Sequence, residues 1–233
     1  MSKPVIEATP NGPYVVSSPP ALKNSKGEEL ETKPVTALCR CGRSSNKPFC
    51  DGTHAKVGFD GSRQTDGSAD KQDHYKGGAI TLNDNRSVCA HAARCTAGLK
   101  TVFKYGEEPW IDPNGASAEE IRKTVENCPS GALSYTMDDV EHADFGRQPS
   151  IYIAKNGPYA VAGGVELKDS MGGQTPQSSE HYTLCRCGGS KNKPFCDGTH
   201  WNGFRRQELD QLDGPCVETS IETSRSDLAV IHA

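Results

Sequence analysis

The sequence predicts an α+β protein made of three small cysteine-bearing units, and three observations lead to that prediction. A cysteine-rich stretch occurs twice, as CRCGRSSNKPFCDGTH at 39–54 and as CRCGGSKNKPFCDGTH at 185–200. A different cysteine segment, CAHAARC at 89–95, lies between the two copies. Hydrophobic residues make up only 34% of the 233 residues, which favours several small units over one large apolar core.

The repeat is longer than its cysteine motif. NGPYVV at 11–16 matches NGPYAV at 156–161, and Phe59 after the first motif matches Phe204 after the second. We therefore expect one domain to be duplicated. The expected boundaries are a first unit at 1–60, a polar linker at 61–74, a middle unit at 75–145, a second copy at 146–206 and a C-terminal tail at 207–233.

Each repeated unit is expected to be rich in β-structure. Short β-prone runs at Tyr14–Val16, Ile151–Ile153 and Tyr182–Leu184 predict strands beside the cysteine loops. The segments 17–34 and 168–180 are polar, so we expect them to be loops. Asp51 and Asp197 precede the Gly-Thr-His segments, where each is expected to cap a short helix that carries the histidine.

The middle unit shows one clear helix signal. Ser117 and Glu120 form a predicted capping box, and Ile121 and Val125 give the helix an apolar stripe. The helix should end at 127–128, because Pro129 disfavours helical geometry in the residue before it. Strands are expected at 79–82 and 131–136, with strand and turns at 102–115.

The ten cysteines are better explained by metal binding than by disulfides. The N-terminus has no apolar segment of the secretory kind, so we expect a reducing, cytoplasmic setting in which disulfides are rare. Both copies have the spacing C-x-C-x8-C-x3-H, and three thiolates with one imidazole suit zinc or an iron–sulfur cluster. The predicted ligands are Cys39, Cys41, Cys50 and His54 in the first copy, and Cys185, Cys187, Cys196 and His200 in the second.

Composition and motifs argue against several other classes. The formal net charge of −4 disfavours nucleic-acid binding, and no run of about 18 apolar residues is present to span a membrane. No phosphate-binding loop, dinucleotide fingerprint or Ser-His-Asp pattern is visible, so we expect neither an organic cofactor nor an enzyme activity.

The repeated motif resembles the CDGSH iron–sulfur domain of the mitoNEET-like family, whose pattern C-x-C-x2-[ST]-x3-P-x-C-D-G-[STA]-H is met in full twice. The resemblance implies one [2Fe–2S] cluster in each copy, held by three cysteines and one histidine. Single-motif relatives form intertwined homodimers. Tandem members make the same pair within one chain, so we expect a monomer with an internal pseudo-two-fold rather than two independent beads.

The middle unit resembles a divergent single-cluster ferredoxin. Such ferredoxins hold a cubane cluster through C-x2-C-x2-C and a distant Cys-Pro. Cys89 and Cys95 fill the first and third positions, and Cys128 the distant one, but the second position is Ala92. Three cysteines imply a [3Fe–4S] cluster. The alternatives are a [4Fe–4S] cluster with His91 as fourth ligand and, less favoured, zinc on the same residues.

These resemblances imply a soluble three-cluster electron-transfer protein with redox partner proteins of unknown identity. The alternative is an iron–sulfur cluster donor, or a redox and pH sensor, that uses labile histidine-ligated clusters. Cys216, in the tail, is expected to be a free thiol. His74, His142, His181 and His232 lack a motif and are expected at the surface. Arg40, Arg186, Lys47 and Lys193 lie within the cysteine loops, where two interpretations stay open: their charge raises the cluster potentials, or they are simple solvated cations.

Overall fold

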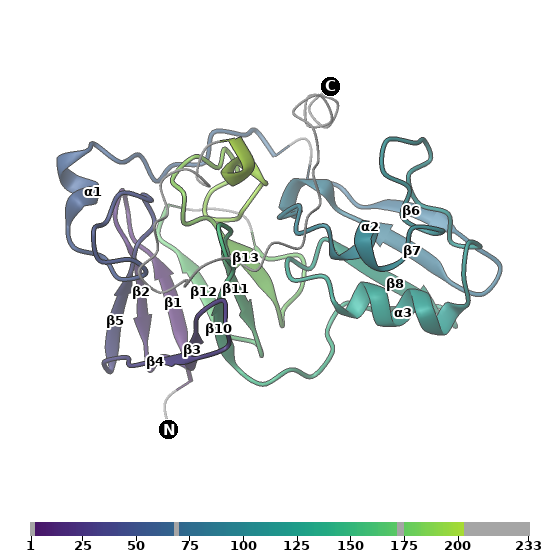
Figure 1. The fold of residues 1–233 in the computed structure, drawn as a ribbon, viewed down its shortest axis with the longest axis horizontal. Coiled ribbons are helices and arrows are strands. Elements are labelled where there is room, and N and C mark those ends of the chain that lie inside the picture. The colour runs from purple at the N-terminus through teal and green to yellow at the C-terminus, as the bar shows by residue number, and fades with distance from the viewer. Residues whose placement is uncertain (1–2, 68–69, 172–174, 203–233) are drawn as a thin grey trace.

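The computed structural model describes residues 3–67, 70–171 and 175–202, and its strands form three sheets. The order is β12-β1-β2-β5 in the first sheet, β13-β11-β10-β3-β4 in the second and β6-β7-β8-β9 in the third. The first two sheets belong to the repeated units and the third to the middle unit (Figure 1). The expected α+β class is confirmed. His232 and Cys216 lie outside the described residues.

The two repeats exchange strands. The first sheet combines β1 (Val5–Ala8), β2 (Tyr14–Ser17) and β5 (Val35–Leu38) with β12 (Glu166–Asp169) of the second repeat. In return, β3 (Ala21–Lys23) and β4 (Glu29–Leu30) join β10 (Ser150–Ile153), β11 (Tyr159–Ala162) and β13 (Tyr182–Leu184). Both exchanged pairings are parallel, with Val5 opposite Glu166 and Ser150 opposite Ala21. The copies are therefore intertwined within one chain and cannot be two separate beads.

Alternation of apolar and polar residues explains the central strands. In β2, Tyr14 and Val16 are buried while Ser17 is exposed, and Tyr159 and Val161 are the buried residues of β11. Side chains at every second position of a strand share a face, so these residues build the core of the pair. Ile6, Leu38, Ile151 and Leu184 complete it from neighbouring strands.

The prediction that 17–34 is a loop is wrong, because this segment contains β3 and β4. The same prediction for 168–180 fails only at its start, where β12 ends at Asp169. Only Leu22 is buried in β3, and β12 has no fully buried residue. These short strands carry almost no apolar pattern, and β3 and β12 each pair with a strand more than a hundred residues away.

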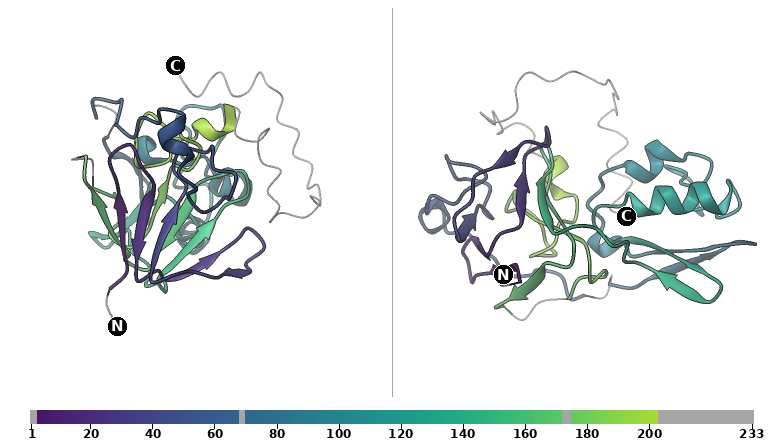
Figure 2. Two further views of the ribbon diagram at one scale, coloured as in Figure 1. Left: turned by 90° about the vertical axis from the view of Figure 1, so that its left-hand side faces the viewer. Right: turned by 90° about the horizontal axis from the view of Figure 1, so that it is seen from below.

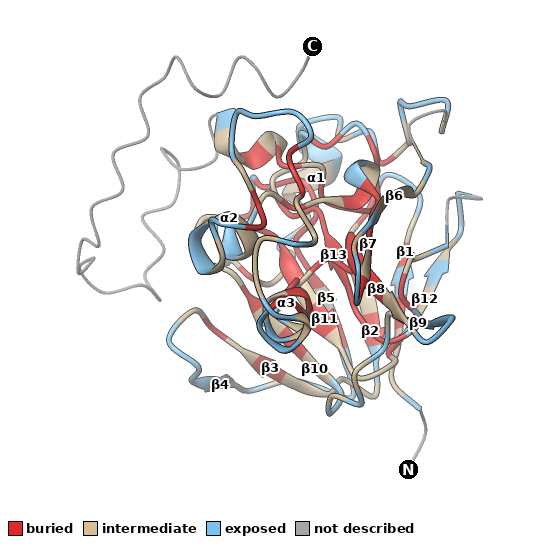
Figure 3. Cartoon of the chain, turned by 90° about the vertical axis from the view of Figure 1, so that its right-hand side faces the viewer, coloured by how far each residue is buried: buried red, intermediate tan, exposed pale blue. Residues whose placement is uncertain are grey.

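The middle unit is a sheet covered by one main helix. Its strands are β6 (Asp73–Lys76), β7 (Thr81–Asp84), β8 (Leu133–Met137) and β9 (Val140–His142). The helix α3 (Ala118–Glu126) packs on β8 and begins with the predicted Ser117–Glu120 capping box. Its C-cap is Asn127, as Pro129 predicts, and one side of α3 is buried (Figure 3). Within 102–115 the only described pairing is an isolated bridge between Phe103 and Ile111.

Short helical segments carry the remaining loops. They are the 3-10 turn η1 (Arg86–Val88), the helix α2 (Arg94–Gly98), the helix α1 (Thr53–Lys56) and the 3-10 turn η2 (Thr199–Asn202). Described residues of the linker also make contacts, because the Gln64 amide donates to the Lys191 carbonyl at 2.8 Å. No helix in the described part of the chain has the length and apolar character needed to cross a bilayer.

Candidate metal centres

The first repeated loop gathers its four predicted ligands into two pairs. The Sγ atoms of Cys39 and Cys41 are 3.8 Å apart, and Cys50 Sγ lies 3.3 Å from His54 Nδ1. β5 delivers Cys39 to the site. The Cys50 amide donates to the Ala37 carbonyl at 2.8 Å, which brings the second pair back to the end of the same strand.

The second loop repeats this arrangement. Cys185 and Cys187 have their Sγ atoms 3.7 Å apart, and Cys196 Sγ lies 3.4 Å from His200 Nδ1. β13 takes the place of β5, and the Cys196 amide donates to the Thr183 carbonyl at 3.0 Å. The predicted ligands of each copy therefore come together at the end of one strand.

The aspartate of each motif organises the turn before the histidine. Asp51 accepts hydrogen bonds from the amides of Ser45 and Thr53, at 2.8 and 3.0 Å. These bonds, led by that from Ser45, lower the pKa of the Asp51 carboxyl. The expectation that Asp51 is the N-cap needs a small correction, since the N-cap of α1 is Gly52, in the left-handed region at φ 84°.

Burial makes these thiols unfavourable as bare anions. It raises the pKa of Cys41 to about 11, of Cys95 to about 11 and of Cys89 to about 12. All nine described cysteines are reduced. A metal that binds thiolate compensates for this burial and displaces the protons. The donor set therefore fits soft metal ions.

The middle site collects cysteines from three segments. Cys89 follows η1, Cys95 lies in α2, and Cys128 comes directly after the C-cap of α3. Next to burial, the nearby Cys128 thiol raises the pKa of Cys95. Between Cys89 and Cys95 the exposed Ala92 offers no donor atom.

His91 does not lie alone in a solvated loop. Its backbone is left-handed at φ 51°, and its amide donates to Cys89 Sγ at 3.4 Å. The Cγ–Cδ2 edge of its ring faces Gly198 in the second repeated loop, where an added Cβ would overlap Cδ2 and lie 3.0 Å from Cγ. Trp201 Nε1 donates to the His91 carbonyl at 3.2 Å.

Arg40 and Arg186 are not solvated: both side chains are buried and hydrogen-bonded to backbone carbonyls. Arg40 is 2% exposed and donates to the carbonyls of Thr9 and Gly61. Arg186 is 3% exposed and donates to Gly157 and Ala154. Each guanidinium therefore ties its cysteine loop to the turn of its own NGPY segment. Lys193 is also buried and donates to the Ser190 carbonyl, while Lys47, half-buried, makes the matching bond to Ser44.

Sequence reasoning missed His181, which was expected at the surface. It has no exposed surface, and burial lowers its pKa to about 4. Its Nδ1 is 2.9 Å from Ser178 Oγ, whereas its buried Nε2 has no hydrogen-bond partner among the described residues. Its one local signal is its position just before the strand that leads to Cys185. His74 is exposed as expected, and His142 is half-buried and stacks on Tyr135.

Asp144, Glu180 and His181 also lie close enough together to resemble a metal site. Their carboxylates are already engaged. Asp144 accepts from Ser178 and Ser179, and Glu180 accepts from the amides of residues 145 and 147. These three side chains therefore form a hydrogen-bonded contact between the segment that follows β9 of the middle unit and the segment that precedes β13.

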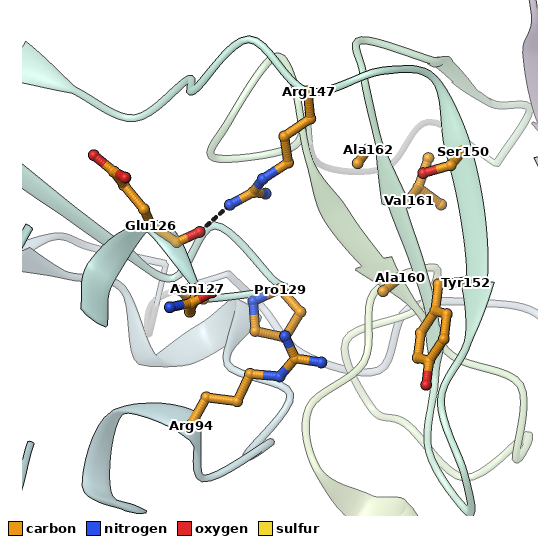
Figure 4. Close-up of a pocket in the computed structure, with 11 residues that line it drawn as sticks. Arg94, Glu126, Asn127, Pro129, Arg147, Ser150, Tyr152, Ala160, Val161 and Ala162 are labelled. Carbon is orange, nitrogen blue, oxygen red and sulfur yellow. Dashed lines mark hydrogen bonds between the residues drawn. The ribbon is translucent and has the colours of Figure 1, made fainter. Parts of the chain in front are cut away.

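A pocket of about 190 Å³ opens beside Cys128, and two arginine side chains reach it from opposite sides (Figure 4). Arg147 donates to the Glu126 carbonyl, whereas Arg94 extends from exposed α2. Tyr152 and Ala160–Ala162 of the second repeat form the far wall. Cys128 of the middle site thus lies at an opening lined by two arginines and one glutamate.

Comparison with known proteins agrees with the geometry. A family described as "Iron-binding zinc finger CDGSH type" matches residues 11–55 and 156–201, and one described as "Divergent 4Fe-4S mono-cluster" matches residues 75–138. The "Uncharacterized protein YjdI" of Escherichia coli, in strains K12 and O157:H7, is 34% identical over 61 residues, which cover 26% of this chain and 80% of the relative. The chain therefore belongs to the CDGSH iron–sulfur proteins, as a tandem member with a divergent single-cluster domain between its two CDGSH units.

Proposed function

We propose that this iron–sulfur protein is a one-electron carrier with three clusters. Each CDGSH loop would hold a [2Fe–2S] cluster, and Cys89, Cys95 and Cys128 would hold a [3Fe–4S] cluster. When bound, such clusters accept and release single electrons. The protein is proposed to be a cytoplasmic carrier for redox partner proteins, with no catalytic chemistry of its own.

The pairing of ligands in each CDGSH loop carries this proposal. In a tetrahedral zinc site with bonds of about 2.3 Å, all sulfur atoms lie about 3.8 Å from one another. Among the described residues, no three Cys or His side chains of either loop offer ligand atoms that all lie within 4.8 Å of one another. Cys39 with Cys41, and Cys50 with His54, are instead two separate close pairs. Two pairs suit two metal ions, one pair on each.

The histidine in the second pair of ligands affects the reduction potential of the site. Imidazole replaces an anionic thiolate, so the oxidised form carries less negative charge and reduction becomes easier. The chain also shields the site, because Cys39, Cys185 and Cys196 are at most 3% exposed. Burial of this kind limits solvent access, which itself affects the potential.

For the middle site, the number of protein thiolates supports three irons. The matched family is described as a 4Fe–4S domain, but Ala92 replaces the second cysteine of the ferredoxin pattern. His91 could replace it as ligand only if a ring nitrogen turned to the cluster. Its ring lies against Gly198 of the second CDGSH loop, with Cδ2 and Cγ as the nearest atoms, so ligation would require the ring to leave this contact. A His91-ligated [4Fe–4S] cluster is therefore the second candidate.

Electron paramagnetic resonance of anaerobically purified, oxidised protein tests the proposal, with iron and sulfide counted on the same sample. Oxidised [2Fe–2S] and [4Fe–4S] clusters are diamagnetic, whereas oxidised [3Fe–4S] is paramagnetic. We expect about one spin and about seven irons per chain. Silence with about eight irons would replace [3Fe–4S] by [4Fe–4S]. Metal without sulfide would contradict electron transfer altogether.

A second candidate function, cluster donation, is favoured by the openness of the first CDGSH loop. Cys50 and His54 are half-buried, whereas Cys196 and His200 in the second loop are buried. An apo-acceptor protein could reach the first pair more easily. Incubation of holo-protein with an apo-ferredoxin would show transfer as a gain of acceptor absorbance, and no transfer over hours would exclude this function.

A further inference from the structure

The two CDGSH loops have the same motif but different surroundings. At six matched positions the second copy is buried where the first is half-buried or exposed. The pairs are Asn46 and Asn192, Lys47 and Lys193, Phe49 and Phe195, Cys50 and Cys196, Gly52 and Gly198, and His54 and His200. Because the motif sequences are nearly identical, neighbouring segments must cause this difference.

The middle domain contacts the second loop directly. Asn192 Nδ2 donates to the Ser87 carbonyl at 2.8 Å, and Trp201 Nε1 donates to the His91 carbonyl at 3.2 Å. The His91 ring fills the space above Gly198.

A second contact joins the same two sites from the other side. The fully buried His181 directly precedes β13, which ends one residue before Cys185. Gly131, three residues after Cys128, lies against His181, since a Cβ there would be 3.0 Å from the His181 carbonyl oxygen. Two ligand-bearing loops of the middle domain therefore touch the second CDGSH unit.

The second unit also contacts the first at their ligand loops. A Cβ on Gly42 would lie 2.6 Å from the carbonyl oxygen of Cys187, and one on Gly188 would lie 2.6 Å from that of Cys41. Figures 1 and 2 show the second repeat between the first repeat, with α1 at the far end, and the middle domain. Among the described residues, the segment that carries Cys89 accepts hydrogen bonds from the second loop, at Ser87 from Asn192 and at His91 from Trp201.

We propose that the three sites form a linear series, in which the middle site communicates only with the second CDGSH site and the first CDGSH site is the opposite terminus. His91 acts in this series as a positioning residue that seats the middle domain on Gly198 and Trp201. The linear series rests on the proposed electron-transfer function. The docking of the middle domain on the second CDGSH loop does not, and it can be tested separately.

The chain supplies a matched pair of variants. Gly52 and Gly198 occupy the same motif position with φ of 84° and 83°, so alanine causes the same backbone strain at both. At Gly52 an added Cβ meets nothing within 4 Å, whereas at Gly198 it meets the His91 ring. Only Gly198→Ala should therefore separate the middle domain from the second loop.

Hydrogen exchange of holo-protein, followed by mass spectrometry, measures the docking directly. We expect amides in 87–93 to exchange about tenfold faster in Gly198→Ala than in Gly52→Ala. The double variant Gly198→Ala with His91→Gly removes the clash and should restore part of the protection. Equal exchange in both alanine variants would contradict the proposed docking of His91 on Gly198. If Gly198→Ala fails to fold, Trp201→Phe removes only the Nε1 hydrogen bond and should still speed exchange in 87–93 more than in 39–54.

Two further measurements test whether His91 is a positioning residue or a ligand, and whether the docking affects electron transfer. His91→Gly should keep the full iron and sulfide content, and loss of one iron would make His91 a ligand instead. Stopped-flow reduction should show slower electron transfer between the middle and second sites in Gly198→Ala, with Gly52→Ala unchanged. Faster exchange with unaltered electron transfer would keep the docking but refute the linear series, and clusters that no reductant can reduce would refute the proposed function alone.

Discussion

Tyr14 and Tyr159 cross at the centre of the CDGSH pair, with ring centroids 6.1 Å apart and planes at 87°, and each hydroxyl reaches the cluster loop of the other copy. Tyr14 donates to the carbonyls of Cys185 and Pro194, both at 2.9 Å. Tyr159 donates to those of Cys39 and Pro48, at 2.9 and 3.0 Å. The tyrosine of each NGPY segment thus supports the site that it does not belong to by sequence.

Removal of either hydroxyl should loosen the opposite site. Tyr14→Phe leaves buried carbonyls at Cys185 and Pro194 short of a donor, at a cost of about 1–3 kcal/mol. We expect faster hydrogen exchange in 185–196 for Tyr14→Phe and in 39–50 for Tyr159→Phe, with a lower thermal midpoint in both. Faster exchange confined to each variant's own repeat would contradict the crossed support. Tyr152→Phe, which loses one bond to the Ser25 carbonyl, is the control.

The histidine ligands should set the potentials of the two CDGSH sites. His54→Cys and His200→Cys each replace imidazole with an additional anionic thiolate. Since all-cysteine [2Fe–2S] centres lie near about −400 mV and histidine-ligated ones between about −150 and +300 mV, each variant should lower one potential by a few hundred millivolts. A redox titration followed by absorbance should show one wave moved in each variant. His74→Gln, at an exposed histidine outside the loops, is the control. Unmoved waves would remove these histidines as ligands.

Local sequence patterns predicted what depends on near neighbours in the chain. The capping box at Ser117 and the end of α3 before Pro129 were both confirmed, because caps and prolines act within one turn. The strands at Tyr14 and Tyr182 alternate or carry enough apolar residues to be recognised. The close pairing of Cys39 with Cys41 also follows from their short spacing.

What could not be predicted depends on contacts between distant segments. β3 and β12 are short and half-exposed, and each takes its place in a sheet by pairing with a strand of the other repeat. Arg40 looked like a solvated cation because the carbonyls that bind it, at Thr9 and Gly61, are 31 and 21 residues away. His181 is buried by a domain whose position no local motif encodes.

The buried Asp84 should make stability depend on pH. It is 1% exposed, and burial raises its pKa to about 7 despite Arg86, whose Nε is 3.8 Å from Oδ2. The folded-state pKa of Asp84 lies above the ordinary value of 3.8. The free energy of unfolding is therefore highest below about pH 4, where Asp84 is protonated in both states, and it falls as pH rises through about 7.

Asp84→Asn, a neutral replacement of the same shape, should remove this dependence. We expect the unfolding free energy of the variant to exceed that of the wild type by a margin that grows by up to a few kcal/mol between pH 5 and pH 8. Thermal midpoints of the full holo-chain between these two pH values would show the divergence. Parallel curves would mean that the ionised carboxylate is fully compensated, for example by Arg86.

The vacant second position of the middle motif should be repairable. Ala92 lies in the loop between Cys89 and Cys95, flanked by left-handed residues at His91, φ 51°, and Ala93, φ 55°. Ala92→Cys supplies the missing thiolate, so we expect iron to rise from about seven to about eight per chain and the oxidised paramagnetic signal to disappear. Ala93→Cys introduces a thiol at a position that the ferredoxin pattern does not use, and it should leave the iron content and the paramagnetic signal unchanged. A wild type that already holds eight irons and is silent would contradict the vacancy, and iron analysis of His91→Gly would then identify the fourth ligand.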